Sequence, residues 1–132
     1  MFEKIKCFIL DMDGTIYLGN ELFSFTKDFL EKVEETGREY YFFTNNSSKS
    51  QQDYIEKLER FGIRIKRQQM MTSTHVISRY LKQHYEGKSV YVVGTPSLIQ
   101  EFQYFGINVT EEDPDIVVLG FDTTLTLSLI HI

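Results

Sequence analysis

Four short apolar runs alternate with amphipathic segments along this chain, and no other feature of the sequence constrains its fold as strongly. The runs are short and rich in β-branched and aromatic residues, so they predict strands, at 5–10, 40–43, 90–93 and 116–119. Apolar residues at i, i+3 and i+4 between the runs predict helices, at 25–35, 54–61, 76–81 and 98–105. This alternation predicts an α/β fold with a three-layer, Rossmann-like parallel sheet covered on both faces.

The ends of the predicted helices carry residues that commonly begin or stop a helix. Thr72 or Ser73 is positioned to cap the third helix, and Thr95 followed by Pro96 predicts the cap and the first position of the fourth. Glycines follow the first, second and fourth predicted helices and predict where these helices end, at Gly37, Gly62 and Gly106. Strand and helix boundaries are therefore predicted along most of the chain.

Length and composition narrow the class of protein further. A chain of 132 residues with 42% apolar residues is long enough for one domain with a core, and is too apolar for a disordered chain. The net charge of −5 argues against nucleic-acid binding, because nucleic-acid phosphates repel an acidic surface. The single cysteine, Cys7, excludes an intrachain disulfide and is expected to be buried in the first strand. No apolar run approaches the roughly 20 residues that span a membrane, and the start lacks a signal-peptide pattern, so we expect a cytoplasmic protein.

Two polar loops follow the first two predicted strands. Asp11 and Asp13 come directly after the first strand, and Thr44, Asn45 and Asn46 come directly after the second. Taken alone, the first loop also fits a hairpin turn, and the second fits a helix N-cap with spare polar residues. Because the carboxyl ends of parallel strands lie at one edge of a sheet, the two loops together predict a functional site there.

The residues of these loops suit phosphoryl transfer. Two carboxylates two residues apart repel each other and need a cation or a shared proton. Mg²⁺ fits, since it binds through one or two carboxylates and takes waters and phosphate oxygens as its other ligands. One carboxylate can attack a phosphoryl group, and the other can protonate the leaving oxygen. Gly14 allows the backbone to turn toward the phosphoryl oxygens, and a hydroxyl from the second loop would complete their binding site.

The sequence from Phe8 to Thr15, an apolar strand followed by DMDGT, resembles the first motif of the haloacid dehalogenase-like hydrolases. The sequence TNNSS at 44–48 resembles the second motif as it occurs in subfamily IIA, the para-nitrophenylphosphatase-like branch that acts on nucleotide and sugar phosphates. The resemblance covers nearly the whole chain, up to about Thr126. It implies an incomplete core of that fold, with residues 1–122 as the N-terminal part of the core, residues 123–132 as the start of the linker to a cap domain, and the cap domain missing.

The resemblance also implies roles for individual residues. Asp11 would be the nucleophile and a magnesium ligand, and Asp13 would be the general acid/base and a second metal ligand, through its backbone carbonyl. Thr44 would supply the phosphate-binding hydroxyl, and Asn45 and Asn46 would line the substrate site. The implied cofactor is Mg²⁺, and the implied substrate is a small phosphorylated metabolite, a nucleotide or a sugar phosphate. No nucleic-acid or membrane partner is implied, and homo-oligomerisation of a full-length parent is left open.

The family's third motif, a lysine, and its fourth, an acidic pair, are not visible in this sequence. Lys49, Lys82 and Lys88 lie in helical or turn contexts before the expected cap and are not assigned to the third motif. At 127–132, alternating apolar residues replace the polar residues that would begin a helix. We therefore expect a truncated reading frame or read-through, and a fragment that has no more than trace activity by itself.

Two other functions remain open at this point. One is a catalytically incomplete fragment that binds phosphate and metal without turning substrate over. The other is a receiver-like phosphoacceptor module, which also places acidic residues after its first strand. That module needs a phosphorylatable aspartate at the end of a middle strand, where this chain has Thr44 and Gly94.

Overall fold

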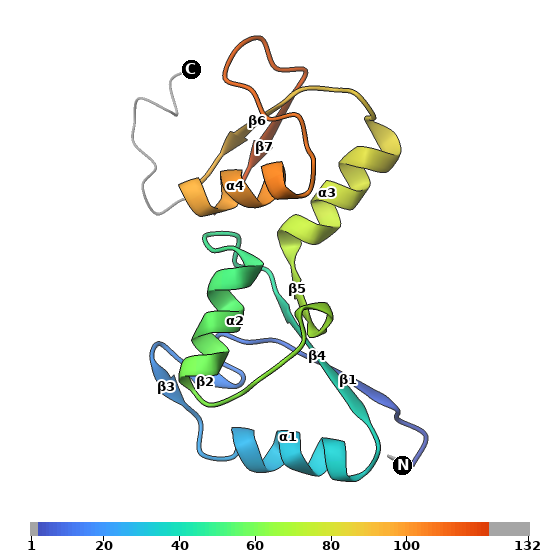
Figure 1. Ribbon diagram of the computed structural model, residues 1–132, viewed down its shortest axis with the longest axis vertical. Coiled ribbons are helices and arrows are strands. Elements are labelled where there is room, and N and C mark those ends of the chain that lie inside the picture. The colour runs from blue at the N-terminus through green and yellow to red at the C-terminus, as the bar shows by residue number, and fades with distance from the viewer. Residues whose placement is uncertain (1–2, 122–132) are drawn as a thin grey trace. The chain divides into compact units, whose positions relative to one another are not determined.

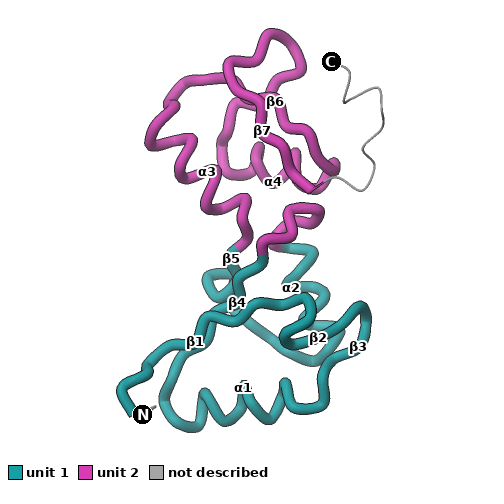
Figure 2. Tube along the Cα trace, turned by 180° about the vertical axis from the view of Figure 1, so that it is seen from behind, with its two compact units in different colours: residues 1–44, 52–71 teal, residues 45–51, 72–132 magenta. Residues whose placement is uncertain are grey.

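The structure is a computed structural model that describes residues 3–121 (Figure 1). Its described residues form two compact units, which Figure 2 colours separately. Unit 1 comprises residues 1–44 and 52–71, and unit 2 comprises residues 45–51 and 72–132, each as far as it is described. Each unit has its own buried core and is treated separately below.

Unit 1 is built on a sheet with the strand order β1 (Cys7–Leu10), β4 (Glu39–Thr44), β5 (Met70–Thr72). β1 and β4 pair in parallel, with Leu10 opposite Phe42. A short antiparallel hairpin, β2 (Tyr17–Leu18) and β3 (Glu21–Leu22), follows the loop after β1. The helical segments are α1 (Thr26–Glu35), α2 (Gln51–Arg60), whose first residue belongs to unit 2, and the 3₁₀ turn η1 (Arg67–Gln69).

The core of unit 1 follows from the alternation along its strands and the stripes along its helices. In β4 every second side chain is buried, since strand side chains point alternately to opposite faces. The large side chains that are almost fully buried include Met12, Tyr17, Phe42, Tyr54 and Leu58. The core therefore joins the loop after β1 to the buried side of α2.

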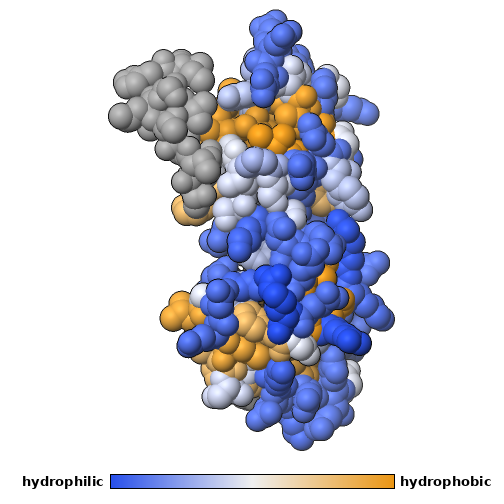
Figure 3. Space-filling view, turned by 60° about the vertical axis from the view of Figure 1, so that its left-hand side comes forward, coloured by the Kyte–Doolittle hydropathy of each residue, from blue (hydrophilic) through white to orange (hydrophobic). Residues whose placement is uncertain are grey.

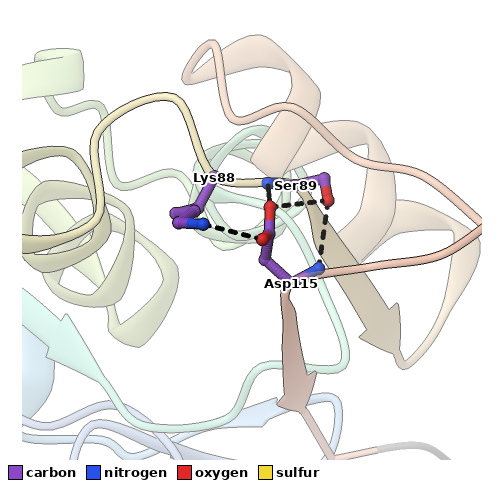
Figure 4. Close-up of polar contacts among 3 residues, drawn as sticks. All are labelled: Lys88, Ser89 and Asp115. Atoms are coloured by element: carbon purple, nitrogen blue, oxygen red, sulfur yellow. Dashed lines mark hydrogen bonds and ion pairs between the residues drawn. The ribbon is translucent and has the colours of Figure 1, made fainter.

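Unit 2 is built on a parallel pair of strands, β6 (Val90–Val93) and β7 (Ile116–Leu119), with Val90 opposite Ile116. Its helices are α3 (Ser73–His84) and α4 (Pro96–Tyr104). At the start of the two strands, Asp115 accepts hydrogen bonds from Lys88 Nζ at 2.9 Å and from the backbone N–H of Ser89 at 2.9 Å (Figure 4). These contacts connect the residues that precede β6 and β7, which lie far apart in the sequence.

The predicted α/β class with parallel strands is confirmed, and all four predicted strands and all four predicted helices are present. The caps of the last two helices are confirmed as well: Thr72 caps α3, and Thr95 Oγ1 accepts a hydrogen bond from the backbone N–H of Leu98 in α4. The assignment of residues 1–122 to the core stays a prediction, and the stretch 123–132 lies outside the described residues.

Two features differ from the prediction. Within the described residues, the four predicted strands are divided between two sheets, where a single sheet was predicted. The second difference is that β2, β3 and β5 were not predicted, because strands of two or three residues are too short to give a periodic signal.

The expected burial of Cys7 is wrong, because its side chain is exposed. β1 lies at the edge of the described sheet, and only alternate residues of β1 are half-buried; Ile9, which shares a face with Cys7, is 76% exposed. Figure 3 shows apolar surface on each unit among hydrophilic residues. Within residues 3–121, no helix is long and apolar enough to cross a membrane.

Candidate active site

The loop after β1 exposes two carboxylates on either side of a buried residue. Met12 is completely buried, and its carbonyl accepts hydrogen bonds from the backbone N–H groups of Thr15 and Ile16, both at 3.1 Å. Asp11 and Asp13, on either side of it, are exposed. The anchored methionine therefore holds the loop in a tight turn that leaves both carboxylates accessible to solvent.

Gly14 gives this turn its direction. Its φ of +81° lies in the left-handed region that residues with a side chain rarely adopt, and a Cβ at this position would have no atom within 4 Å. Its N–H donates to the carbonyl of Tyr17 at 2.8 Å, so the expected role of Gly14 rests on the backbone conformation and not on its own N–H. The loop is not itself a hairpin, because the hairpin of β2 and β3 begins only at Tyr17.

Thr44 is the last residue of β4, the neighbour of β1. Because Leu10 pairs with Phe42 in parallel register, the residues that follow Leu10 and Phe42 lie at the same edge of the sheet. The structure thus brings Asp11 and Thr44 to one edge of unit 1, as the sequence predicted. The side chain of Thr44 is only 1% exposed.

Asn45 and Asn46 belong to unit 2 and are described with it. Asn46 Oδ1 accepts hydrogen bonds from the backbone N–H of Ser48 at 3.0 Å and from its hydroxyl at 2.7 Å, which is an Asx turn. Asn45 is exposed, and its carbonyl accepts a hydrogen bond from Ser73 Oγ at 3.5 Å. The side-chain oxygen of Asn46 therefore shapes the loop, and the contact of both residues with substrate stays a prediction.

Tyr17 and Lys57 are two residues near the carboxylates that the sequence analysis missed. Tyr17 is fully buried, and Lys57 is only 9% exposed, with its Nζ 3.8 Å from the centre of the Tyr17 ring. Burial, and then the negative charge of Asp13, raise the pKa of the Tyr17 hydroxyl far above its ordinary value. The sequence held one signal for Lys57, a charged residue within the apolar stripe that Tyr54 and Phe61 mark on this helix.

The residues present fit a magnesium ion. The described residues contain no group of three or more His, Cys, Asp or Glu side chains that could hold a metal. Mg²⁺ does not need one, because it is commonly bound through one or two carboxylates together with waters and substrate phosphate. Asp11 and Asp13 offer such a pair, both exposed and both at a strand end. Of the unassigned lysines, Lys88 is paired with Asp115 in unit 2.

Comparison with known proteins assigns the family. The family model of the haloacid dehalogenase-like hydrolases matches residues 8–108. The chain belongs to this family. Among curated proteins it is 31% identical over 124 residues to the 5'-nucleotidase YutF of Bacillus subtilis, covering 94% of this chain and 48% of that protein. It is 30% identical over 125 residues to an acid sugar phosphatase of Staphylococcus aureus, again covering 94% of this chain and 48% of the relative.

Solved structures agree with this assignment. A 4-nitrophenylphosphatase from Thermotoga maritima superimposes with a TM-score of 0.91 at 40% identity, over 97% of this chain and 49% of that one. A glycerol phosphate phosphatase from Mycobacterium tuberculosis, solved in complex with magnesium, gives a TM-score of 0.81 at 25% identity, over 96% of this chain and 39% of that one. The recognition of the para-nitrophenylphosphatase-like branch from the two motifs is therefore confirmed. The chain spans about half the length of the curated relatives it matches.

Proposed function

We propose that this chain carries the nucleophile and the general acid/base of a magnesium-dependent phosphomonoester hydrolase that acts through an aspartyl-phosphate intermediate. The observation that carries the proposal is the pair of exposed carboxylates, Asp11 and Asp13, on either side of buried Met12 at the carboxyl end of β1. Membership of the haloacid dehalogenase-like hydrolases supports it. A carboxylate at such a position can act as a nucleophile toward phosphorus when the charge on the phosphoryl oxygens is offset.

Each residue has a distinct part in the proposed reaction. Asp11 attacks the phosphorus, and Asp13 protonates the departing oxygen and then takes a proton from the water that hydrolyses the intermediate. The carboxylate of Asp11 and the backbone carbonyl of Asp13 would hold Mg²⁺, which neutralises charge on the phosphoryl oxygens when it is bound. Gly14 sets the loop conformation, Thr44 contributes a hydroxyl for phosphate, and Asn45 and Asn46 line the substrate site.

The proposed substrate is a small phosphorylated metabolite with a single phosphate ester, either a nucleotide or a sugar phosphate. The names of the relatives support both classes, since one is a 5'-nucleotidase and another an acid sugar phosphatase. The described loops carry residues suited to phosphate and metal, so they favour a monoester without selecting the group attached to it. The proposal places the protein in the cytoplasm.

Replacing the nucleophile tests the proposed function. In the full-length gene product, Asp11→Asn is expected to lower magnesium-dependent phosphate release from 4-nitrophenyl phosphate by at least about 10³-fold, because a covalent step loses its nucleophile. The matched control is Asp115→Asn, which removes one carboxylate in unit 2 and is expected to leave turnover unchanged. Turnover is measured with Mg²⁺ and with excess chelator.

The outcomes separate the proposed function from its alternatives. Wild-type turnover by Asp11→Asn would overturn the assignment of the nucleophile. Turnover that persists in excess chelator would overturn the magnesium requirement. Binding of phosphate and Mg²⁺ by the wild-type protein without any turnover would identify the catalytically incomplete form instead.

A further inference from the structure

Hydrogen bonds within unit 2 tie residues 45–51, the loop that follows β4, to the first turns of α4. The carbonyl of Ser48 accepts a hydrogen bond from Thr95 Oγ1 at 2.9 Å. The backbone N–H of Ser50 donates to Ser97 Oγ at 3.1 Å. Both bonds are only partly buried, so water can take the place of a lost partner. By themselves these two bonds constrain the loop weakly.

The last residue of the loop makes a shorter and buried contact with the same helix. The backbone N–H of Gln51 donates to Glu101 Oε1 at 2.7 Å, and the two residues are only 2% and 5% exposed. Gln51 is the first residue of α2, and the first N–H groups of a helix have no acceptor within that helix. Because solvent is largely excluded here, the carboxyl oxygen of Glu101 determines where the loop ends.

Glu101 occupies a position in α4 that packing alone would give to an apolar residue. It lies on the buried side of the helix with Leu98 and Phe102, at the spacing of one helix face. Burying a carboxyl group costs free energy unless its oxygens are hydrogen-bonded. The contact with Gln51 supplies such a bond, and an apolar side chain could not make it.

The residues proposed to line the substrate site lie at the other end of the same short loop. Asn46 Oδ1 closes an Asx turn with Ser48, and only residues 49 and 50 separate that turn from Gln51. A segment this short has few conformations once both of its ends are fixed. Release of Gln51 therefore loosens the turn and, with it, Asn45 and Asn46.

We propose that Glu101 is a positioning residue, which holds the N–H of Gln51 and thereby keeps the loop 45–51 in its substrate-binding conformation. This inference rests on the proposed function, in which Asn45 and Asn46 line the substrate site. Glu101 acts through the backbone of the loop and does not touch the substrate. The loop carries neither the nucleophile nor the general acid/base. Loosening it therefore weakens the binding of substrate and transition state alike, which raises KM more than it lowers kcat.

Substitutions of Glu101 in the full-length gene product test the inference with 4-nitrophenyl phosphate as substrate. Glu101→Met keeps a long side chain and removes the acceptor, so it is expected to raise KM about tenfold and to leave kcat within about twofold of wild type. Glu101→Gln keeps an oxygen that can accept from Gln51 and is expected to keep KM within about threefold of wild type. Glu86→Gln, at an exposed position in unit 2, is the matched control and is expected to change neither constant.

A second pair of variants tests the same hydrogen bond from its donor. Gln51→Pro removes the N–H at the first position of a helix, where proline is well tolerated, and Gln51→Ala removes the side chain but keeps the N–H. Because both variants lose the buried side chain, the ratio of their KM values isolates the N–H. KM is expected to be about fivefold higher in Gln51→Pro than in Gln51→Ala. This ratio decides the inference should Glu101→Met fail to fold.

A purely structural role of Glu101 predicts a different pattern. Partial unfolding lowers the active fraction, so the apparent kcat falls while KM is unchanged. Thermal unfolding of every variant is measured alongside to detect such a loss. An unchanged KM in Glu101→Met, an equal rise of KM in Glu101→Met and Glu101→Gln, or a fall in kcat alone would overturn the inference.

Asn45→Ala separates this inference from the function beneath it. If its KM is normal while Glu101→Met raises KM, the substrate contact assigned to Asn45 fails and the positioning role stands. If Asn45→Ala raises KM and Glu101→Met does not, only the positioning role fails. Wild-type turnover by Asp11→Asn, measured separately, would instead overturn the proposed function.

Discussion

Units 1 and 2 each contain a parallel pair of strands, but the ends of those strands are used differently. In unit 1, β1 ends at Leu10 and is followed by the exposed carboxylates of Asp11 and Asp13, and the space beside Gly14 is open. In unit 2, β6 is followed by Gly94 and β7 by Gly120, and the buried side chain of Leu98 packs closely against both glycines.

The difference shows that strand pairing alone does not make a site. After β6 the polar residue Thr95 serves as a helix cap, where its hydroxyl accepts from Leu98 N–H at 3.3 Å and donates to the carbonyl of Ser48 at 2.9 Å. After β1 the two aspartates are exposed and cap no helix. The same position at the end of a parallel strand therefore carries exposed carboxylates in unit 1 and packing contacts in unit 2.

Removing one large core side chain from each unit gives the largest expected effect on stability. Phe42→Ala in unit 1 and Phe102→Ala in unit 2 are each expected to lower the free energy of unfolding by about 3–5 kcal/mol, because both rings are almost fully buried. Hydrogen exchange followed by mass spectrometry is expected to show lost protection only in the unit that carries the substitution. Equal loss across both units would show that they unfold as one cooperative body.

Thr26→Val tests how strongly α1, the helix after the hairpin, supports the loop that carries Asp11 and Asp13. The buried Thr26 hydroxyl donates to the carbonyl of Ile16 at 2.7 Å, and valine keeps its shape but leaves that carbonyl without this donor. The free energy of unfolding of unit 1 is expected to fall by about 1–3 kcal/mol, measured by urea denaturation. Thr110→Val, at a half-buried position in unit 2, is the control and is expected to stay within about 0.5 kcal/mol. A loss no greater than that of the control would contradict the role of this hydrogen bond.

Thr95→Ala tests the interpretation of the loop after β6 as structural. Loss of an N-cap hydroxyl is expected to cost about 1 kcal/mol of unfolding free energy in unit 2. Thr95→Ser keeps the hydroxyl and is expected to retain most of that stability. If Thr95→Ala instead lowered phosphatase turnover in a protein of unchanged stability, the contrast between the two loops would be wrong.

The two units are expected to lose stability at opposite ends of the pH scale. Hydrogen bonds from Lys88 and Ser89 lower the pKa of Asp115 in unit 2 to about 2, so this contribution is complete above pH 3.8 and is lost as the pH falls toward 2. In unit 1, burial and a hydrogen bond to Glu34 raise the pKa of Tyr40 to about 12, so this contribution is complete below pH 10 and is lost as the pH rises toward 12.

Variants separate these two contributions from the rest of the titration curve. Asp115→Asn is expected to reduce the loss of unit 2 stability at acid pH. Tyr40→Phe is expected to reduce the loss of unit 1 stability at alkaline pH. Hydrogen exchange resolved by segment measures both, and the effect of exposed Asp115 is expected to be the smallest of this series. An unchanged loss in either variant would contradict the assignment of that group.

The strands, helices and most helix ends could be predicted because they depend on short-range patterns. Apolar runs, helical spacing and the Thr95–Pro96 cap are local, and each predicted element is present. The family, and with it the expected part of Asp11 and Asp13, followed from two motifs at the ends of predicted strands. Parallel pairing of β1 with β4 then places Asp11 and Thr44 at one edge of the sheet of unit 1.

Contacts between residues distant in the sequence were decided only by the tertiary structure. Nothing in the pattern divides the strands between two sheets, because the choice of partner depends on which faces meet in space. Cys7 appeared suited to a core and is exposed, since no described strand or helix covers that side of β1. The burial of Lys57 was not predicted either, because its contact with the ring of Tyr17 joins residues 40 positions apart in the sequence. Periodicity determines which side of an element is apolar, but burial and electrostatic environment depend on what packs against that side.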